Sequence, residues 1–300
     1  MARKTVSAWQ QRHARRGQKS LMRLIAGQDE EIQRAIIEAA KQAERQIALL
    51  PGEGVGAAVR EFQYQQMRAS LLSLADDLWG DQLAAIITEN ATTAAQLAAN
   101  NSKDILSIIG RGLKPGQANL LMASMQSSAT STFDNLVSRM VNDINLSPNV
   151  FNAEAYMTGK IDDIVNKGIL LGQSADEIAK NVTQFINPNV SGGVKYAAHR
   201  LGRTELNNAY HETSIRSYQE SPYVDGVKWN LSGSHPTPDV CNEYATETSF
   251  KLGEGVYPPD SVPAKPHPNC FCYLTPITPD PDEFVNRMLN GDYDCSVVNA

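Results

Sequence analysis

The sequence lacks the long apolar run that a membrane span requires. A helix crosses a bilayer with about 20 consecutive apolar residues, and no stretch of these 300 residues approaches that length. The N-terminus also lacks an apolar segment followed by a small-residue cleavage site. We therefore expect a chain that neither spans a membrane nor carries a signal peptide for export.

Aromatic residues are scarce and cysteines are few. Aromatic side chains make up 7% of the sequence, which together with abundant Ala, Gln and Asn favours helices that pack through small side chains. The chain has 4 cysteines, and in a reducing cytoplasm such cysteines are metal ligands or free thiols more often than disulfides. A metal site is therefore a better expectation than a disulfide framework.

Acidic residues are absent from the first 25 positions. Residues 1–25 hold seven basic side chains, whereas all 33 acidic residues lie beyond them. A basic arm on an acidic body predicts an electrostatic contact with nucleic acid or with an acidic protein surface. The contact residues that we expect are Arg12, Arg15, Arg16 and Lys19. The alternative is a solvated, partly disordered N-terminus without a partner.

The first half of the chain has the apolar spacing of helices. An amphipathic helix is expected to start at Asp29 and to end before Pro51-Gly52. Its apolar stripe consists of Ile32, Ile36, Ala39, Ala43, Ile47 and Leu50. Residues 55–100 continue the helical period, as one long helix or as a pair broken near Gly80, and a further helix ends near residue 145. These patterns predict an all-helical domain over residues 26–150.

The second half begins with helices and ends with strands. Helices are expected through residues 161–164, after a capping box at Ser174–Glu177, and over residues 194–218. Residues 226–231 then alternate apolar and polar side chains and predict a strand. Residues 271–274 also predict a strand, and we expect the two strands to pair antiparallel. The fold class that we expect is a mainly α N-terminal domain followed by a small α+β domain. That second domain covers residues 151–276, has a short antiparallel sheet and a zinc site, and precedes a tail at residues 277–300.

The clearest chemistry lies between residues 235 and 272. Cys270 and Cys272 are two residues apart, so a strand would present both thiolates on one side. With Cys241 and His267 they would form a Cys3His tetrahedral set that favours a closed, structural zinc site. His235 is a fifth candidate for the four places, and spacing does not decide between the two histidines. The alternative is a set of buried or free thiols beside a proline-rich turn.

These motifs together resemble the minor head proteins of tailed bacteriophages that are named after the F protein of phage Mu. The resemblance covers about residues 170–276. It rests on the turn and helix beginning Gly168-Ile-Leu-Leu-Gly-Gln-Ser-Ala-Asp-Glu-Ile-Ala, the helix His199-Arg-Leu-Gly-Arg-Thr-Glu-Leu-Asn-Asn-Ala-Tyr, a Trp-containing strand, Pro-Asp-Val-Cys241, and Pro266-His-Pro-Asn-Cys-Phe-Cys-Tyr-Leu. Relatives often have a basic residue between the two cysteines that correspond to Cys270 and Cys272. Phe271 stands there in this chain, so any contact made by that basic residue is not expected.

The resemblance implies a structural protein and not an enzyme. Such a protein is incorporated in low copy number during head assembly in the host cytoplasm and then lies inside the capsid of the virion, near the portal vertex. The implied partners are the portal protein, packaged double-stranded DNA, with which the protein can be ejected, and scaffold or major capsid protein.

The alternative is an enzyme or toxin carried by a phage, of the transferase or nuclease type, that uses the C-terminal domain. A transferase could use Arg203 and Glu205, but two residues apart on a helix they point to different sides. We therefore expect structural roles for both, as hydrogen-bonding residues between their helix and the β region. His211-Glu212 begins like a metalloprotease helix, yet Ile215 stands where the second histidine is required.

Overall fold

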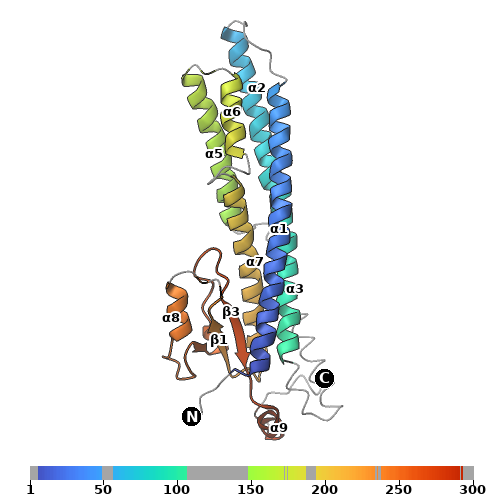
Figure 1. Ribbon diagram of the computed structural model, residues 1–300, viewed down its shortest axis with the longest axis vertical. Coiled ribbons are helices and arrows are strands. Elements are labelled where there is room, and N and C mark those ends of the chain that lie inside the picture. The colour runs from blue at the N-terminus through green and yellow to red at the C-terminus, as the bar shows by residue number, and fades with distance from the viewer. Residues whose placement is uncertain are drawn as a thin grey trace. The chain divides into compact units, whose positions relative to one another are not determined.

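The structure is a computed structural model of the 300-residue chain. It describes residues 6–48, 57–106, 148–171, 173, 175–186, 194–233, 235, 238–290 and 292. These residues are mostly helical, with one small sheet (Figure 1). In chain order the elements are α1 (Ala8–Ala48), α2 (Ala57–Asp76), η1 (Asp77–Leu83), α3 (Ala84–Leu106), α5 (Pro148–Leu170), α6 (Ala175–Ile186), α7 (Val194–Gln219), β1 (Gly226–Asn230), α8 (Val240–Thr246), β2 (Val256–Tyr257), η3 (Pro259–Ser261), β3 (Tyr273–Ile277) and α9 (Pro281–Leu289).

The chain divides into two compact units, each built from separate stretches of sequence. Unit 1 comprises Met1–Leu24, Ala91–Asn142 and Thr204–Ala300, and unit 2 comprises Ile25–Asn90 and Asp143–Arg203. The boundaries fall within α1, α3 and α7, so this division differs from the sequential domains expected from the sequence. The described residues of unit 2 form helices, whereas those of unit 1 also form the sheet.

Helix α1 begins earlier than the apolar pattern predicted. It starts at Ala8 and not near Asp29, so the basic residues of the expected arm are helical from that point on. Before the first turn, Ser7 Oγ accepts a hydrogen bond from the backbone N–H of Gln10 at 3.2 Å, and Gln10 Oε1 accepts one from the backbone N–H of Ser7 at 3.0 Å. This Ser-x-x-Gln capping box satisfies amides that have no partner within the helix, which explains the earlier start.

The apolar stripe predicted for α1 packs into the core of unit 2. Ile32, Ile36, Ala39 and Ala43 are buried there, as predicted. The side chains of the last two stripe positions, Ile47 and Leu50, lie outside the described part of the chain. The same core holds Leu71, Trp79, Ile161, Ile178, Val182 and Ala198, which come from α2, η1, α5, α6 and α7. Full burial of a large aliphatic side chain stabilises a fold by about 1.5 to 3 kcal/mol, so the interlocking stripes are the main support of this unit.

The stretch from Ala57 to Leu106 is helical without interruption. Elements α2, η1 and α3 follow one another directly, and Gly80, the predicted weak point, lies inside the π-helical segment η1. A π-helical segment is wider than an α-helix. Leu78, Trp79 and Leu83 in this segment are all buried. The weak point is therefore accommodated within the helix and does not separate two helices.

Polar contacts join α2 to the α5–α6 region within unit 2. Arg68 Nε and Nη2 donate to the two carboxylate oxygens of Asp162, both at 2.7 Å. The hydrogen bonds from the guanidinium lower the pKa of Asp162. Tyr64 Oη donates to the backbone carbonyl of Gln173 at 2.8 Å. Two-point arginine–carboxylate contacts are geometrically specific, so this pair helps to set the register of the two helices.

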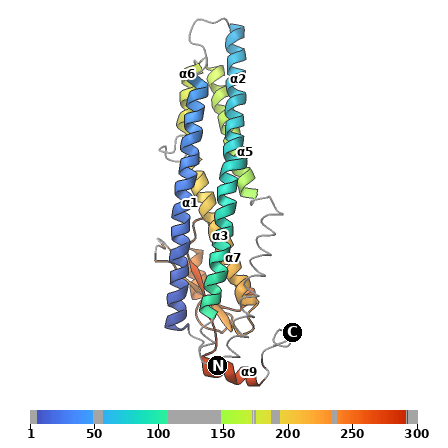
Figure 2. The same cartoon turned by 90° about the vertical axis from the view of Figure 1, so that its right-hand side faces the viewer.

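The predicted pairing of the two C-terminal strands is confirmed. In unit 1, β1 and β3 pair antiparallel with Trp229 opposite Leu274, and β2 pairs with the other side of β1. The register ends where Asn230, the last residue of β1, lies opposite Tyr273, so β3 has no partner strand before that point. The prediction that a strand begins at Phe271 is therefore wrong, and both neighbouring cysteines precede β3. Helix α9 follows β3 and is the red helix in Figure 2.

The remaining sequence predictions fare differently. The helix predicted over residues 194–218 is confirmed as α7, and the one through residues 161–164 as part of α5. The helix predicted to end near residue 145 and Ser174 of the predicted capping box lie outside the described residues. No described helix has the length and apolar character needed to cross a bilayer.

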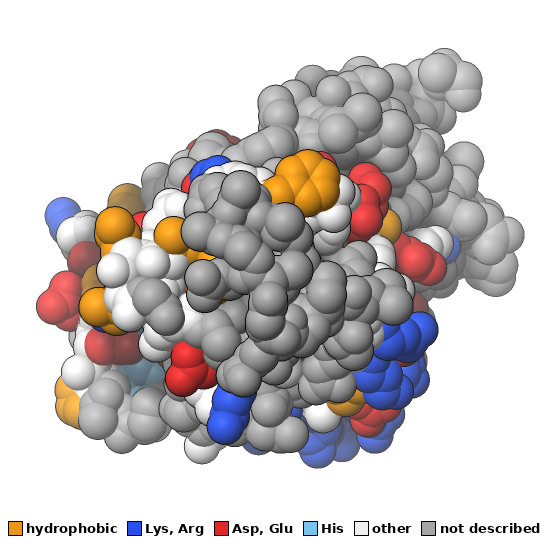
Figure 3. Space-filling model, turned by 90° about the horizontal axis from the view of Figure 1, so that it is seen from above, with side chains coloured by type: hydrophobic (Ala, Val, Ile, Leu, Met, Phe, Trp, Pro, Cys, Tyr) orange, Lys and Arg blue, Asp and Glu red, His pale blue; other side chains and the backbone are white. Residues whose placement is uncertain are grey.

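Acidic and basic side chains lie among the apolar ones on the face shown in Figure 3.

Candidate metal centre

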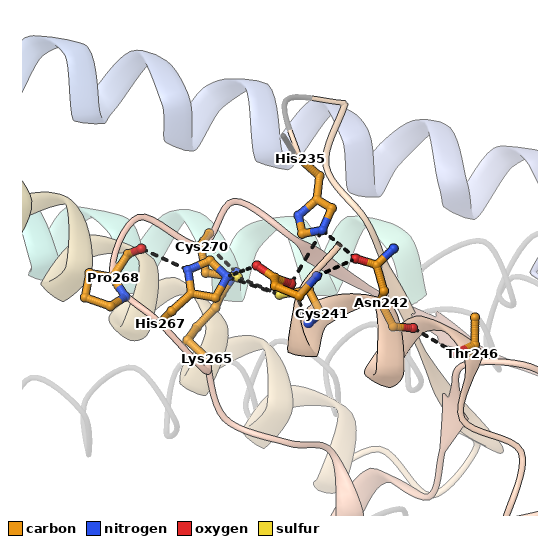
Figure 4. Close-up of polar contacts among 9 residues, drawn as sticks. His235, Cys241, Asn242, Thr246, Lys265, His267, Pro268 and Cys270 are labelled. Carbon is orange, nitrogen blue, oxygen red and sulfur yellow. Dashed lines mark hydrogen bonds and ion pairs between the residues drawn. The ribbon is translucent and has the colours of Figure 1, made fainter. Parts of the chain in front are cut away.

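Two short segments of unit 1 supply the candidate ligands. Cys241 lies in the first turn of α8, and His267 and Cys270 lie in the loop before β3 (Figure 4). Asp239 Oδ1 accepts a hydrogen bond from the backbone N–H of Cys241 at 2.7 Å, and Asn242 Oδ1 accepts one from the backbone N–H of Asp239 at 3.1 Å. This reciprocal cap fixes the start of α8 and therefore the position of Cys241.

The loop before β3 turns at Asn269. This residue has a φ of 58°, in the left-handed region that asparagine adopts more readily than most other side chains. The turn lies between His267 and Cys270, and both side chains face Cys241 across the gap between the loop and α8 (Figure 4). A local backbone conformation thus brings the two loop ligands to the same place.

Cys241, His267 and Cys270 form a compact group whose ligand atoms all lie within 4.8 Å of one another. Cys241 Sγ is 3.4 Å from His267 Nε2 and 3.6 Å from Cys270 Sγ. Tetrahedral zinc, with Zn–S of about 2.3 Å and Zn–N of about 2.0 Å, requires edges of about 3.8 Å between two sulfurs and about 3.5 Å between sulfur and nitrogen. The observed spacings lie within about 0.2 Å of these edges. The compact group could therefore hold a metal ion.

The His267 ring is oriented as a metal ligand should be. Its Nδ1 lies 3.0 Å from the backbone carbonyl of Pro268, and because a carbonyl only accepts, Nδ1 carries the hydrogen. In the neutral imidazole Nε2 keeps its lone pair, and this atom faces Cys241 Sγ and, at 3.1 Å, Asp239 Oδ2. A lone pair and a carboxylate repel each other unless a proton or a cation lies between them. The arrangement of acceptors therefore fits a cation.

Three buried thiols share this place. Cys241, Cys270 and Cys272 are all free and buried. A hydrogen bond from Cys272 lowers the pKa of Cys270 to about 5, whereas burial raises the pKa of Cys241 to about 12. The hydrogen bond with Cys270 also raises the pKa of Cys272. One thiolate is thus favoured without a metal, and a dication would favour deprotonation of the other two. Cys272 lies outside the compact group but contacts Cys270, one of its members.

His235 lies outside the compact group. Its Nε2 is 2.8 Å from Asn242 Oδ1 and 3.5 Å from Asp239 Oδ1, so its ring nitrogen faces the capping side chains of α8 (Figure 4). The sequence did not decide which of the two histidines is the ligand. In the structure His267 lies in the compact group with Cys241 and Cys270, whereas His235 lies beside that group. His235 supports the cap that positions Cys241.

The sequence pattern missed Asp239 and Lys265. Asp239 carried a signal, since an Asp followed by Asn242 at the third helical position is typical of a capping box. Lys265 carried none, because its role depends on a loop conformation that no periodicity predicts. Its Nζ donates to the backbone carbonyl of Cys270 at 3.1 Å and to that of Cys272. Burial lowers the pKa of Lys265, while the thiols of Cys270 and Cys272 raise it.

The predicted contact residues lie on α1. Arg12, Arg16 and Lys19 are exposed and are spaced four and three residues apart, so they share one helix face. Arg15 is exposed as well, but its Nε donates to the hydroxyl of Tyr273 at 3.1 Å, within unit 1. Of the four predicted contact residues, Arg12, Arg16 and Lys19 therefore form an exposed basic face, whereas Arg15 bonds to Tyr273.

Arg203 and Glu205, the two polar residues of α7 that the sequence singled out, belong to different units. Arg203 belongs to unit 2, where its Nε donates to Asp29 Oδ2 of α1 at 3.0 Å. Arg203 therefore has a hydrogen-bonding role toward α1, and its expected bond to the β region stays a prediction. Glu205 belongs to unit 1 and is half-buried.

His211 also lacks the setting of a metalloprotease ligand. It is buried on α7, and its Nε2 donates to the backbone carbonyl of Pro263 at 2.9 Å. Burial lowers the pKa of His211 to about 3, so the ring is neutral at pH 7. Its ring also contacts the edge of Trp229, with 5.4 Å between ring centroids. These contacts give His211 a packing role in the core of unit 1.

No protein-family model, curated protein or solved structure matches the chain. The resemblance described above therefore rests on the sequence motifs alone.

Proposed function

We propose that this chain is a structural minor head protein of a tailed bacteriophage, and that one zinc ion bound by Cys241, His267, Cys270 and Cys272 holds its β region together. The convergence of a cysteine from α8 with a histidine and a cysteine from the β3 loop is the observation that supports this proposal most. The motifs over residues 170–276 supply the phage assignment.

The chemistry of the donors favours zinc. Thiolate and imidazole ligands in tetrahedral geometry are typical of zinc, and four protein ligands leave no position for a substrate. Cys272 is the natural fourth ligand, since it is buried and hydrogen-bonded to Cys270. Structural zinc sites in small domains contribute on the order of 10 to 16 kcal/mol of apparent binding free energy, which becomes folding free energy of the region that they join.

Binding, not catalysis, is the role that we assign to the protein in the particle. The exposed basic face at Arg12, Arg16 and Lys19 suits an acidic patch of the portal or the phosphates of packaged double-stranded DNA. Scaffold or major capsid protein are further partners during assembly. Quantitative mass spectrometry of procapsids, full virions and DNA-emptied particles tests this role: we expect a low, fixed number of copies per portal ring, and absence from all three would refute it.

An enzyme or toxin carried by the phage is the second candidate function. One observation favours it: among the described residues the compact group has three members, and three protein ligands with an open position are typical of catalytic zinc. Replacing Cys272 distinguishes the two. A structural four-ligand site predicts that Cys272→Ser loses stoichiometric zinc in an elemental analysis of the purified protein. Zinc retained at one ion per chain would favour the three-ligand, catalytic site. The matched control is Cys295→Ser, because Cys295 is the one cysteine outside residues 235–272, and this variant should retain zinc.

A further inference from the structure

Lys265 lies directly against the candidate metal centre. Its Nζ contacts the backbone carbonyls of Cys270, at 3.1 Å, and Cys272, and it lies 4.0 Å from Cys270 Sγ. The ring of Trp229 is a further neighbour, with its centroid 5.9 Å from Nζ. Cys270, Cys272 and Trp229 are all buried. The ammonium group is thus held among buried atoms, although a lysine on the surface could keep its charge in water.

The two carbonyls give the ammonium a positioning role. Both belong to residues that carry thiols, and they flank Phe271, the residue that separates these thiols along the chain. An ammonium group that donates to both carbonyls fixes the backbone of this short segment before it enters β3. The distance between the two sulfurs is thereby held without a ladder of strand hydrogen bonds, which begins only at Tyr273.

The charge of Lys265 discriminates between ligand sets. A dication bound by three thiolates and a neutral imidazole has one net negative charge, which one ammonium group balances. With only two thiolates the metal and its ligands would be neutral, and the ammonium that contacts the Cys270–Cys272 segment would have no counter-charge from the ligands. An uncompensated buried charge is strongly destabilising. Enclosure of a lysine here therefore favours three thiolates.

We propose that Lys265 is a positioning residue of the metal centre, which clamps the Cys270–Cys272 segment and balances the charge of a third thiolate, so that Cys272 and not a solvent molecule completes the ligand set. This inference rests on the proposed metal site. It adds a reason for the closed, four-ligand form of that site which the ligands themselves do not supply.

The test compares zinc and cobalt binding of the full chain with that of two lysine variants. Lys265→Met removes the charge and the donors while keeping the length of the side chain, and Lys228→Met is the matched control, a half-buried lysine on β1. Competition with a chromophoric chelator measures zinc affinity. Residues that orient metal ligands typically contribute 10- to 100-fold to affinity, so we expect about that loss for Lys265→Met and about wild-type affinity for Lys228→Met.

Cobalt substitution supplies a readout that a merely structural lysine would not change. The intensity of thiolate-to-cobalt charge-transfer absorption reports the number of thiolates bound. We expect the intensity of three thiolates in the wild type and of fewer in Lys265→Met, with recovery in Lys265→Arg, which restores the charge. If Lys265→Met does not fold, the zinc affinity and the cobalt spectrum of Lys265→Gln, which also lacks the charge, are compared with those of the wild type.

The outcomes separate this inference from the proposed function. A wild-type chain that binds no metal refutes both. A wild type that binds one zinc through three thiolates, with unchanged affinity and spectrum in Lys265→Met, refutes only the role of Lys265. A wild-type cobalt spectrum of two thiolates refutes the charge-balance reasoning as well, whatever the variants do.

Discussion

Replacement of Asp239 separates two contributions that one carboxylate makes to the metal centre. Its Oδ1 caps α8 by accepting from the backbone N–H of Cys241, while its Oδ2 lies 3.1 Å from the ligand nitrogen of His267. Asp239→Asn keeps a good capping acceptor and removes the charge. Asp239→Ala removes both. The pair of variants therefore measures the electrostatic contribution apart from the helix cap.

The structure sets the size of each effect. A carboxylate next to His267 Nε2 would lie about 4 Å from a bound cation, where unit charges interact by about 1 kcal/mol in water and about 4 kcal/mol at a partly enclosed site. The Asp239 side chain is 34% exposed, so we take the lower part of that range, about 1 to 2 kcal/mol, or about 5- to 30-fold in zinc affinity. Loss of the cap in Asp239→Ala costs about 1 kcal/mol more.

Chelator competition at low ionic strength, repeated at about 1 M salt, measures both effects. Asp239→Asn should weaken zinc binding about 5- to 30-fold at low salt, and the difference should shrink at high salt because exposed charges are screened. Asp239→Ala should be weaker still at either salt concentration. If Asp239→Asn bound zinc as tightly as the wild type at low salt, no cation would lie beside Oδ2, and the location that we assign to the metal would be refuted.

Two further predictions concern stability. Arg68→Met should lower the free energy of unfolding only modestly at pH 7, since both partners of its pair with Asp162 are about one-third exposed. Because Arg68 lowers the pKa of Asp162, this contribution is present above the pKa of an unfolded aspartate and is lost as the pH falls through the lowered folded value, so urea unfolding of the two proteins should converge in strong acid. Gly255→Ala should cost at least about 3 kcal/mol, because Gly255 has a φ of +65° and a Cβ there would lie 2.4 Å from the carbonyl oxygen of Ala245. Gly233→Ala should change the free energy of unfolding in urea by less than about 0.5 kcal/mol, because among the described residues no atom beyond the chain neighbours lies within 4 Å of a Cβ there. Equal effects of the two alanines would contradict the contact at Gly255.

The spacing of apolar residues along the sequence predicted some of the helices and strands correctly. Helix α7 and the antiparallel pair β1–β3 were predicted in this way, although the strands are buried at nearly every position and not on one face alone. The start of α1 was missed because the apolar stripe alone was followed, although Ser7 and Gln10 had the spacing of a capping box. The start of β3 was missed because a strand ends with its partner, and the position of Asn230 opposite Tyr273 depends on the register of the whole sheet.

The candidate site was predicted to a similar extent. Residue type and spacing are sufficient to name Cys241, His267 and Cys270 as candidate ligands, because few side chains bind soft metals. The choice between two histidines depends on which loop approaches α8, which is a tertiary property. The contribution of Lys265 depends on the path of two backbone carbonyls, so no sequence pattern could reveal it.

The candidate metal centre lies in a part of unit 1 where the described residues have little regular structure. Between β1 and β3 the described residues include only α8, β2 and η3, with seven, two and three residues. Ordering such a connection costs about 1 to 2 kcal/mol per residue in backbone entropy, and elements this short bury little apolar surface in return. Cys241 and Cys270 are 29 residues apart in sequence, so an ion that joins them closes most of the connection. The ligands are therefore expected at the ends of this irregular segment, since strands β1 and β3 are already held by their own hydrogen bonds and would gain less from a metal.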